Sequence, residues 1–200
     1  VVTRVTVDKE VKDGKMRVTW RPAFDIVDSA TVTPDPKIAA VVKAYQDKLD
    51  TALKVDIGTT TTPLDSRRAT VRGDEAAIGD LFADAMRAAV GADGAITNGG
   101  GIRADREDPA GTVLTRADIF AELPFGTKTV KLSVTGEQLR AALVNGFSQA
   151  DQGAGRFPQV SGLTVDVDLS KPPRERVLTI KVGDKPLDLS ATYTLATNDF

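Results

Sequence analysis

Three consecutive glycines at positions 99–101 constrain the fold of this chain more than any other feature. They follow the short apolar run Ala95-Ile96-Thr97 and Asn98, and Arg103 comes shortly after them. Glycine adopts positive φ without strain and lets another group approach the main chain closely. Free amides in such a loop can form an anion-binding nest, and a guanidinium is a planar, permanently charged donor. The segment therefore predicts either an anion site at the end of a buried strand or an ordinary surface turn, which glycine clusters usually mark.

The composition excludes several kinds of catalysis. The chain has 200 residues, no Cys and no His. Thiol catalysis, disulfides, a Ser–His triad and His-ligated zinc are therefore ruled out within it. Sites for Mg²⁺ or Ca²⁺ made from carboxylates alone stay open. The net charge of −2 gives no reason to expect a nucleic-acid partner, and no apolar run is long enough to span a bilayer.

The first 56 residues predict a hairpin followed by a long helix. Strands at 1–11 and 16–24 flank Asp13-Gly14, which is a strong signal for a two-residue hairpin turn. Because a lone hairpin is only marginally stable in water, we expect it to belong to an upstream domain or to pack on the rest of the chain. Asp35-Pro36 then has the pattern of a helix N-cap, and apolar residues continue at helical spacing to Lys54.

From residue 55 onward, expected strands and helices alternate. Strands are expected at 55–62, 95–97, 128–134, 163–168, 177–182 and 193–196, and helices at 74–90, 115–122 and 135–147. Thr115 and Thr135 begin capping-box patterns, and Gly91 is suited to terminate the first of these helices. We therefore predict an α+β fold with mixed β-sheets and flanking helices.

Arginines and one aromatic residue fall at the ends of these elements. Arg67, Arg68 and Arg72 form a basic cluster, and Arg72 lies just before an expected helix N-terminus, where anions are favoured. Phe125 lies in an apolar loop from which a ring can stack on a base. Surface charge for the arginines and a core position for Phe125 are the alternatives. A loose dinucleotide-binding pattern at 99–104 is rejected, because 108–111 interrupts the long helix that it requires.

Five motifs occur in an order typical of one protein family. They are Asn98-Gly-Gly-Gly-Ile-Arg103, Leu123-Pro-Phe-Gly126, Val134-Thr-Gly-Glu-Gln-Leu139, Gly155-Arg-Phe-Pro-Gln159 with Ser161-Gly162, and Ala196-Thr-Asn-Asp-Phe200. With them, residues 57–200 resemble the C-terminal domain of the 5′-nucleotidase family, which includes secreted and periplasmic UDP-sugar hydrolases. The resemblance implies a layered α/β/β/α domain. It also implies that 1–33 are the last strands of an upstream metallophosphatase domain, and that 34–56 form the helix between the two domains.

The same resemblance implies a site. In the family the N-terminal domain holds two metal ions and attacks the phosphate, while the C-terminal domain binds the rest of the nucleotide. By motif match, Phe125 and Phe200 would sandwich the base. The ribose and phosphate side would be held by Arg68, Arg72 and Arg103. The same pocket would include Asn98, Gly99, Gly100, Gly101, Gly155 and Thr127. Thr127 stands where the family often has Asn, which weakens the implied contact with the base edge. The family's Gly-Gly-Asp segment is expected after Phe200, so part of the pocket is expected to be missing.

The resemblance thus implies the nucleotide-specificity domain of a metal-dependent phosphohydrolase, inactive by itself. Its expected partners are a nucleotide or nucleoside and the metallophosphatase domain. We expect no cofactor in this chain and two divalent metal ions in the upstream domain. The implied location is extracellular, periplasmic or at the cell surface. A non-catalytic nucleoside-binding module and a structural domain whose loops bind nothing are the alternatives. The preferred base stays open, because stacking tolerates every base.

Overall fold

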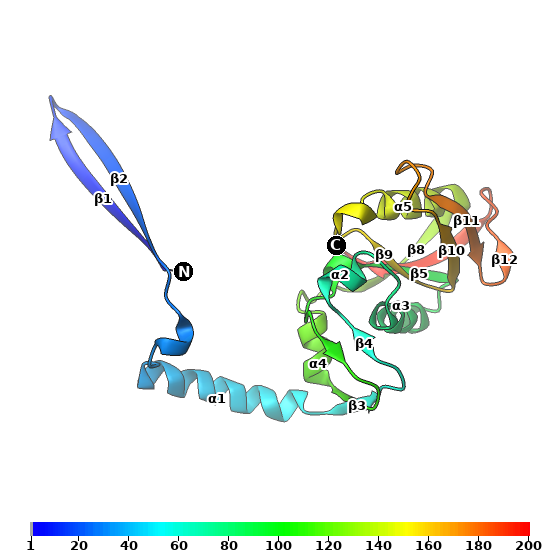
Figure 1. Cartoon of the computed structure of the whole chain (residues 1–200), viewed down its shortest axis with the longest axis horizontal. Helices are drawn as coiled ribbons and strands as arrows, with labels where there is room; N and C mark the ends of the chain where they lie inside the picture. Colours follow the sequence, from blue (N-terminus) through cyan, green and yellow to red (C-terminus); the bar gives the residue numbers. More distant parts are fainter. Residues whose placement is uncertain (1) are drawn as a thin grey trace. The chain divides into compact units, whose positions relative to one another are not determined.

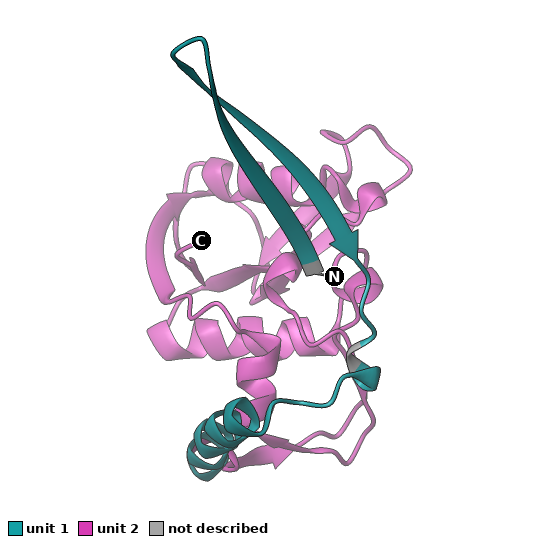
Figure 2. Cartoon of the chain, turned by 90° about the vertical axis from the view of Figure 1, so that its left-hand side faces the viewer, with its two compact units in different colours: residues 1–51 teal, residues 52–200 magenta. Residues whose placement is uncertain are grey.

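The computed structural model describes residues 2–200. The chain divides into two compact units (Figure 2), an N-terminal unit that ends at Thr51 and a C-terminal unit from Ala52 to Phe200. None of the helices described is long and apolar enough to cross a membrane.

The N-terminal unit begins with the predicted hairpin. Strands β1 (Val2–Lys12) and β2 (Lys15–Asp25) pair antiparallel. Asp13 and Gly14 join them with φ of 54° and 72°, as a type I′ turn requires. The register pairs Val7 with Trp20. Side chains alternate between the two faces of the hairpin, and the two faces differ in polarity. One face carries exposed apolar side chains, namely Val5, Val7, Val11, Met16, Val18, Trp20 and Phe24.

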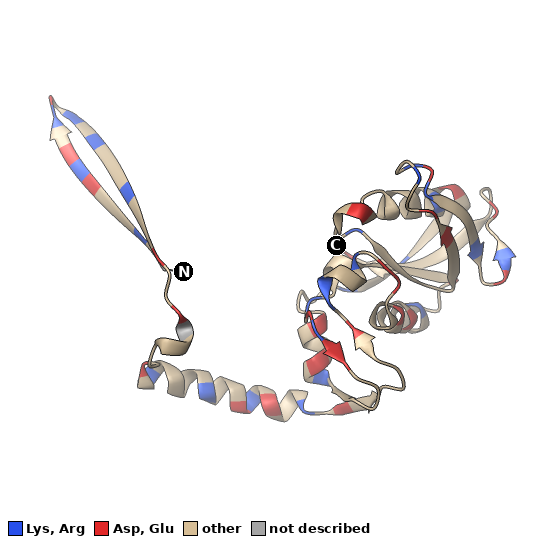
Figure 3. Cartoon of the chain, in the orientation of Figure 1, with Lys and Arg blue, Asp and Glu red and all other residues tan. Residues whose placement is uncertain are grey.

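The short turn η1 (Ser29–Thr31) leads to helix α1 (Pro36–Leu53). Asp35 caps the helix as predicted, since its Oδ1 accepts from the amides of Lys37 at 2.8 Å and Ile38 at 3.2 Å. Basic and acidic residues are interspersed along α1 (Figure 3), and Lys43 pairs with Asp47 one turn later. Its apolar stripe, which includes Tyr45, is exposed.

A four-stranded mixed sheet organises the C-terminal unit (Figure 1), with the strand order β8-β13-β5-β9. These strands are β8 (Thr129–Thr135), β13 (Thr192–Asn198), β5 (Gly94–Asn98) and β9 (Pro158–Ser161). The central strands β13 and β5 are parallel, and the outer pairings are antiparallel. The predicted α+β fold with mixed sheets is therefore confirmed.

Helices α3 (Ala77–Val90) and α5 (Gly136–Phe147) cover opposite faces of this sheet. Ala95 of β5 packs with Ala83 of α3, whereas the next residue, Ile96, packs against the core cluster that contains Leu139 and Leu143 of α5. Alternation of side chains along a strand explains this division.

Smaller elements complete the unit. A second sheet contains β10 (Leu163–Val167), β11 (Val177–Val182) and β12 (Lys185–Pro186). Two short pairs join β3 (Asp56–Thr59) to β7 (Val113–Thr115) and β4 (Leu64–Asp65) to β6 (Glu107–Asp108). The remaining elements are α2 (Arg68–Val71), α4 (Arg116–Glu122), and the turns η2 (Gly99–Gly101) and η3 (Ala150–Gln152).

Most predicted elements are present, with differences at a few boundaries. Thr115 and Thr135 form the predicted capping boxes of α4 and α5. The helix expected from residue 74 begins at Ala77, and α2 before it was not predicted. The strands β4, β6, β7, β9 and β12 were also missed. They are two to four residues long, too short for a periodic pattern to predict them.

Candidate functional site

The glycine triplet forms the turn η2 at the end of β5. Gly99 donates its amide to Phe157 O at 2.7 Å, and Gly100 donates to Gly155 O at 2.8 Å. A Cβ on Gly99 would lie 1.8 Å from Val71 O, and one on Gly100 would lie 2.8 Å from the Gly155 Cα. None of the three glycines has positive φ. The first two glycines are therefore needed for the close approach of other backbone and not for positive φ. Their amides do not form an anion nest, because the protein's own backbone accepts from both.

Three arginines come together beside this turn. Arg68 begins α2, Arg72 follows its last residue, and Arg103 follows η2. Burial, followed by the charges of Arg68 and Arg103, lowers the pKa of Arg72. The Arg72 Nε is buried and has no hydrogen-bond partner among residues 2–200. Like charges that lie close together repel one another, and an anion bound among them would relieve that repulsion.

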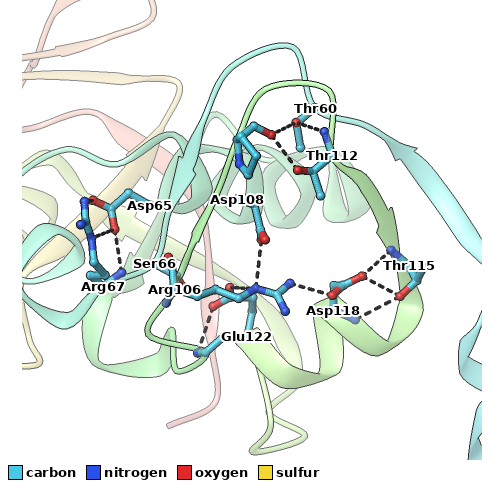
Figure 4. Close-up of polar contacts among 12 residues, drawn as sticks. Thr60, Asp65, Ser66, Arg67, Arg106, Asp108, Thr112, Thr115, Asp118 and Glu122 are labelled. Atoms are coloured by element: carbon cyan, nitrogen blue, oxygen red, sulfur yellow. Dashed lines mark hydrogen bonds and ion pairs between the residues drawn. The ribbon is translucent and has the colours of Figure 1, made fainter.

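Their neighbour Arg67 has a different role. It pairs with Asp65 at 2.5 Å (Figure 4) and with Glu107 at 3.0 Å. The pKa of Asp65 is well below its usual value, chiefly because of the hydrogen bond from Arg67. Within the described chain, no ion pair is found for Arg68, Arg72 or Arg103. These four arginines thus separate into one structural arginine and three whose charge has no carboxylate partner among the residues described.

Two adjoining cavities open at the end of β5 and β13. The first, of about 460 Å³, is lined by Arg103, Phe125 and Thr127 among others. The second, of about 650 Å³, is lined by Arg72 and Gly155. Both are lined by Asn98, Gly100, Asn198 and Phe200.

An exposed aromatic ring lies next to one of the charges. Phe125 is 62% exposed, and the Arg103 Cζ lies 5.6 Å from its ring centroid. Phe200 is also exposed and lines both cavities. Exposed rings beside guanidinium groups are suited to a ligand that has both a planar ring and an anionic group.

The structure brings nearly all predicted site residues to these cavities. Gly101 lines the first cavity. The two exceptions are Gly99, which is buried, and Arg68, whose side chain lines neither cavity. Asn198 was missed, although it lies in the last of the five family motifs. It donates its Nδ2 to Asn98 Oδ1 at 3.0 Å. A prediction of the parallel pairing of β5 with β13 would have indicated Asn198, because this pairing brings the carboxyl ends of both strands to one edge of the sheet.

A polar network supports the segment after Arg103 (Figure 4). Arg106 pairs with Asp108 at 3.0 Å and with Asp118 at 2.6 Å. Glu122, which is 2% exposed, accepts from the Ala104 amide at 3.2 Å, and its carbonyl accepts from the Arg103 amide at 2.9 Å. Burial raises the pKa of Glu122, whereas the Thr115 hydroxyl is the main cause that lowers the pKa of Asp118 to about 2. The backbone of Arg103 is therefore anchored to α4.

A separate cavity of about 660 Å³ lies beside α3 and is lined by Asp80 and Asp84. Burial, then the charges of Glu75 and Asp84, raises the pKa of Asp80 to about 6. Between about pH 4 and pH 6 this carboxyl is protonated in the folded state and ionised in the unfolded state. Its contribution to the free energy of unfolding therefore falls as pH rises through that window.

We expect Asp80→Asn to raise the free energy of unfolding at pH 7.5 by about 1 kcal/mol, after discounting for solvent screening, and not to raise it at pH 4. Denaturant unfolding at both pH values measures this. The comparison is Asp84→Asn, which removes only one of the charges that act on Asp80 and also weakens a hydrogen bond accepted from Ser161, so its gain in stability at pH 7.5 should be smaller than that of Asp80→Asn. Equal stability of Asp80→Asn and the parent at pH 7.5 would contradict the assignment.

In the portion that the structure covers, no group of three acidic, His or Cys residues is arranged to hold a metal ion. The residues present therefore do not fit the two-metal centre that the resemblance implies for the family, and no catalytic step through metal ions is assigned to them.

The fold and the site together define an α+β domain with an arginine cluster and exposed aromatic rings at the end of a mixed sheet. The family model of the 5′-nucleotidase C-terminal domain matches residues 56–200. The chain belongs to this family.

Relatives of known sequence and structure agree with this assignment. The chain is 36% identical over 177 residues to the trifunctional nucleotide phosphoesterase protein YfkN of Bacillus subtilis, covering 83% of this chain and 12% of that protein. It is 28% identical to the snake venom 5′-nucleotidase of Naja atra, covering 94% of this chain and 39% of that protein. The crystal structure of a 5′-nucleotidase precursor from Thermus thermophilus matches with a TM-score of 0.71 and 32% identity, covering 98% of this chain and 39% of that one. The chain thus spans well under half the length of these relatives.

Proposed function

We propose that the C-terminal unit binds a nucleotide and sets the substrate preference of a 5′-nucleotidase-type phosphohydrolase. The observation that carries the proposal is that two arginines with no carboxylate partner within residues 2–200, Arg72 and Arg103, line adjoining cavities together with two exposed aromatic rings. Phosphate and ribose oxygens fit the guanidinium groups, which donate in a planar fork. A base fits between Phe125 and Phe200, because every base has a π-face on which a ring can stack.

Hydrolysis is assigned to a domain outside these residues. We propose that two divalent metal ions and the attacking groups belong to an upstream metallophosphatase domain, and that the chain alone does not release phosphate. The apolar face of the β1–β2 hairpin supports this arrangement, since such a face is stable in water only when another apolar surface covers it. We propose that residues 1–33 complete that domain and that 34–56 connect it to the nucleotide-binding unit.

We also propose an extracellular, periplasmic or cell-surface location. A snake venom enzyme among the relatives supports it, and the absence of cysteine is compatible with it.

Calorimetric titration of the chain with AMP, adenosine and UDP-glucose, without metal, tests the proposal. We expect saturable binding of at least one ligand, and tighter binding of AMP than of adenosine because the arginines meet the phosphate. Phe125→Ala should weaken binding about 5- to 150-fold, the range for one lost base stack.

Phe120→Ala is the matched control, because Phe120 is 58% exposed on the neighbouring helix α4 and lines neither cavity. It should bind as the parent does. The absence of binding to all three ligands, both by this chain and by a version extended past Phe200, would overturn the proposal, and an equal loss in both variants would overturn the assignment of Phe125. A phosphate-release assay on the same samples tests whether the chain alone is inactive.

A further inference from the structure

Gln159 is a buried polar residue that lines neither cavity of the candidate site. It lies on β9 opposite Thr97 of β5, and it is 1% exposed. Its Nε2 donates to the carbonyl oxygens of Val71 at 3.2 Å and Asp74 at 2.8 Å. Its Oε1 accepts from the Ala76 amide at 3.1 Å. Both amide hydrogens and the amide oxygen are therefore used, and every partner belongs to the backbone of one distant segment.

That segment connects α2 to α3. Val71 is the last residue of α2, and Ala76 is the N-cap of α3, which receives no cap from a side chain of its own. Helix ends leave backbone groups without intrahelical partners. A single side chain thus satisfies the end of one helix and the start of the next. Removing it would leave buried carbonyl and amide groups without partners, which costs free energy and lets the segment move.

The position of Arg72 depends on the same segment. Arg72 directly follows Val71, whose carbonyl lies where a Cβ of Gly99 would be. The Nη1 atom of Arg72 lies 3.8 Å from the position that a Cβ added to Gly155 would take. The Val71 carbonyl is therefore held between Gln159 on one side and the glycine turn on the other. A shift of that carbonyl would carry Arg72 away from the cavity that it lines.

The other end of α2 is held in a similar way. The Arg68 amide donates to Asp105 Oδ1 at 2.8 Å. A helix of four residues has little stability of its own, so contacts with other parts of the chain hold it in place. They include these two side chains and the packing of Val71 in a hydrophobic cluster. Of the two, Gln159 is the one adjacent to Arg72.

We propose that Gln159 is a positioning residue for the anion-binding part of the site, and that it acts through Arg72. This inference rests on the proposed nucleotide-binding function. Gln159 should therefore affect the affinity for ligands that carry a phosphate much more than the affinity for the nucleoside, because the aromatic rings lie on other loops.

The test measures the affinity of the chain for AMP and for adenosine by titration calorimetry. Gln159→Met, of similar length, should weaken AMP binding about 10-fold to 100-fold, as expected for a misplaced charged hydrogen-bond donor. Adenosine binding should change less than about 3-fold. The matched control is Gln138→Met, which removes another helix-capping glutamine, at the start of α5. This control should leave the ratio of the two affinities unchanged.

A second variant displaces the side chain without removing it. A Cβ on Gly79 would lie 2.4 Å from Gln159 Oε1. Gly79→Ala within α3 favours the helix, so this variant is expected to fold even if Gln159→Met does not. It should show the same selective loss of AMP affinity.

A double-mutant cycle distinguishes positioning from general destabilisation. In an Arg72→Ala background, Gln159→Met should change AMP affinity less than about 2-fold, because the group through which it acts is gone. A full additional loss there would overturn the proposal, and so would unchanged AMP affinity in the folded Gly79→Ala variant. If neither the parent chain nor the version extended past Phe200 binds either ligand, the proposed function fails. If the parent binds AMP and the variants keep its preference over adenosine, only the role of Gln159 fails.

Discussion

Arg176→Met is expected to lower the free energy of unfolding of the C-terminal unit by about 2–4 kcal/mol. Arg176 is 6% exposed and lies just before β11. Its Nη1 donates to the carbonyls of Phe147 at 3.0 Å and Ser148 at 3.1 Å, at the end of α5. The same atom donates to Asp151 Oδ1 at 2.7 Å, and its Nε donates to Lys171 O at 3.2 Å.

The size of this effect depends on the partners that remain. Methionine fills part of the volume but has no donor, so the helix-terminal carbonyl groups lose their partner in a poorly solvated place. Removal of the buried charge recovers some desolvation free energy, which keeps the net loss below the sum of the bonds.

Chemical denaturation followed by circular dichroism measures the change. Arg174→Met, an exposed arginine in the same loop, is the control and should change stability by less than about 0.5 kcal/mol. Similar stability of the two variants would show that the contacts of Arg176 carry little free energy.

Gly99→Ala is expected to destabilise the C-terminal unit by about 3 kcal/mol or more and to abolish AMP binding. The new Cβ would lie 1.8 Å from Val71 O and 2.8 Å from Val71 C. Both are backbone atoms, so no side-chain rotation relieves the overlap. Either α2 or the turn η2 must move, and each carries an arginine at its end.

Gly101→Ala provides the matched control within the same triplet. Its nearest neighbour would be Asn98 Oδ1 at 3.6 Å, which is an ordinary contact. Thermal unfolding and AMP titration of both variants should separate the positions, with a large loss of stability only at Gly99. Comparable behaviour of the two would contradict the close approach of α2 to the glycine turn.

Local sequence patterns predicted much of the fold because the interactions that form those elements are local. Asp13-Gly14 determines its hairpin turn through its own φ angles. Asp35 caps α1 through amides two and three residues away, and Thr115 and Thr135 cap their helices over a similar span. The order of five motifs indicated the family, which the match over 56–200 confirms.

The site was predicted only in part, because its arrangement depends on residues far apart in the chain. Arg67 and Arg72 have the same chemistry in the sequence, yet only the fold supplies Arg67 with two carboxylates and leaves the Arg72 Nε without a partner in the described part of the chain. No local pattern predicts a helix of four residues such as α2. The roles proposed for the predicted site residues in nucleotide binding stay predictions.

The amino-acid sequence by itself determined the hairpin, the capped helices, the alternation of strands and helices, and the family, since each depends on neighbours along the chain. The tertiary structure alone decided which backbone segments approach the glycine triplet. It also decided which arginines have no acidic partner among the described residues, and which side chains hold the segments that carry those arginines. Gln159 reaches Val71 across 88 positions, and Asn198 reaches Asn98 across 100. Contacts over such separations form only when the sheet brings β5, β9 and β13 together, so hydrogen bonding and burial at the site result from packing rather than from any local pattern.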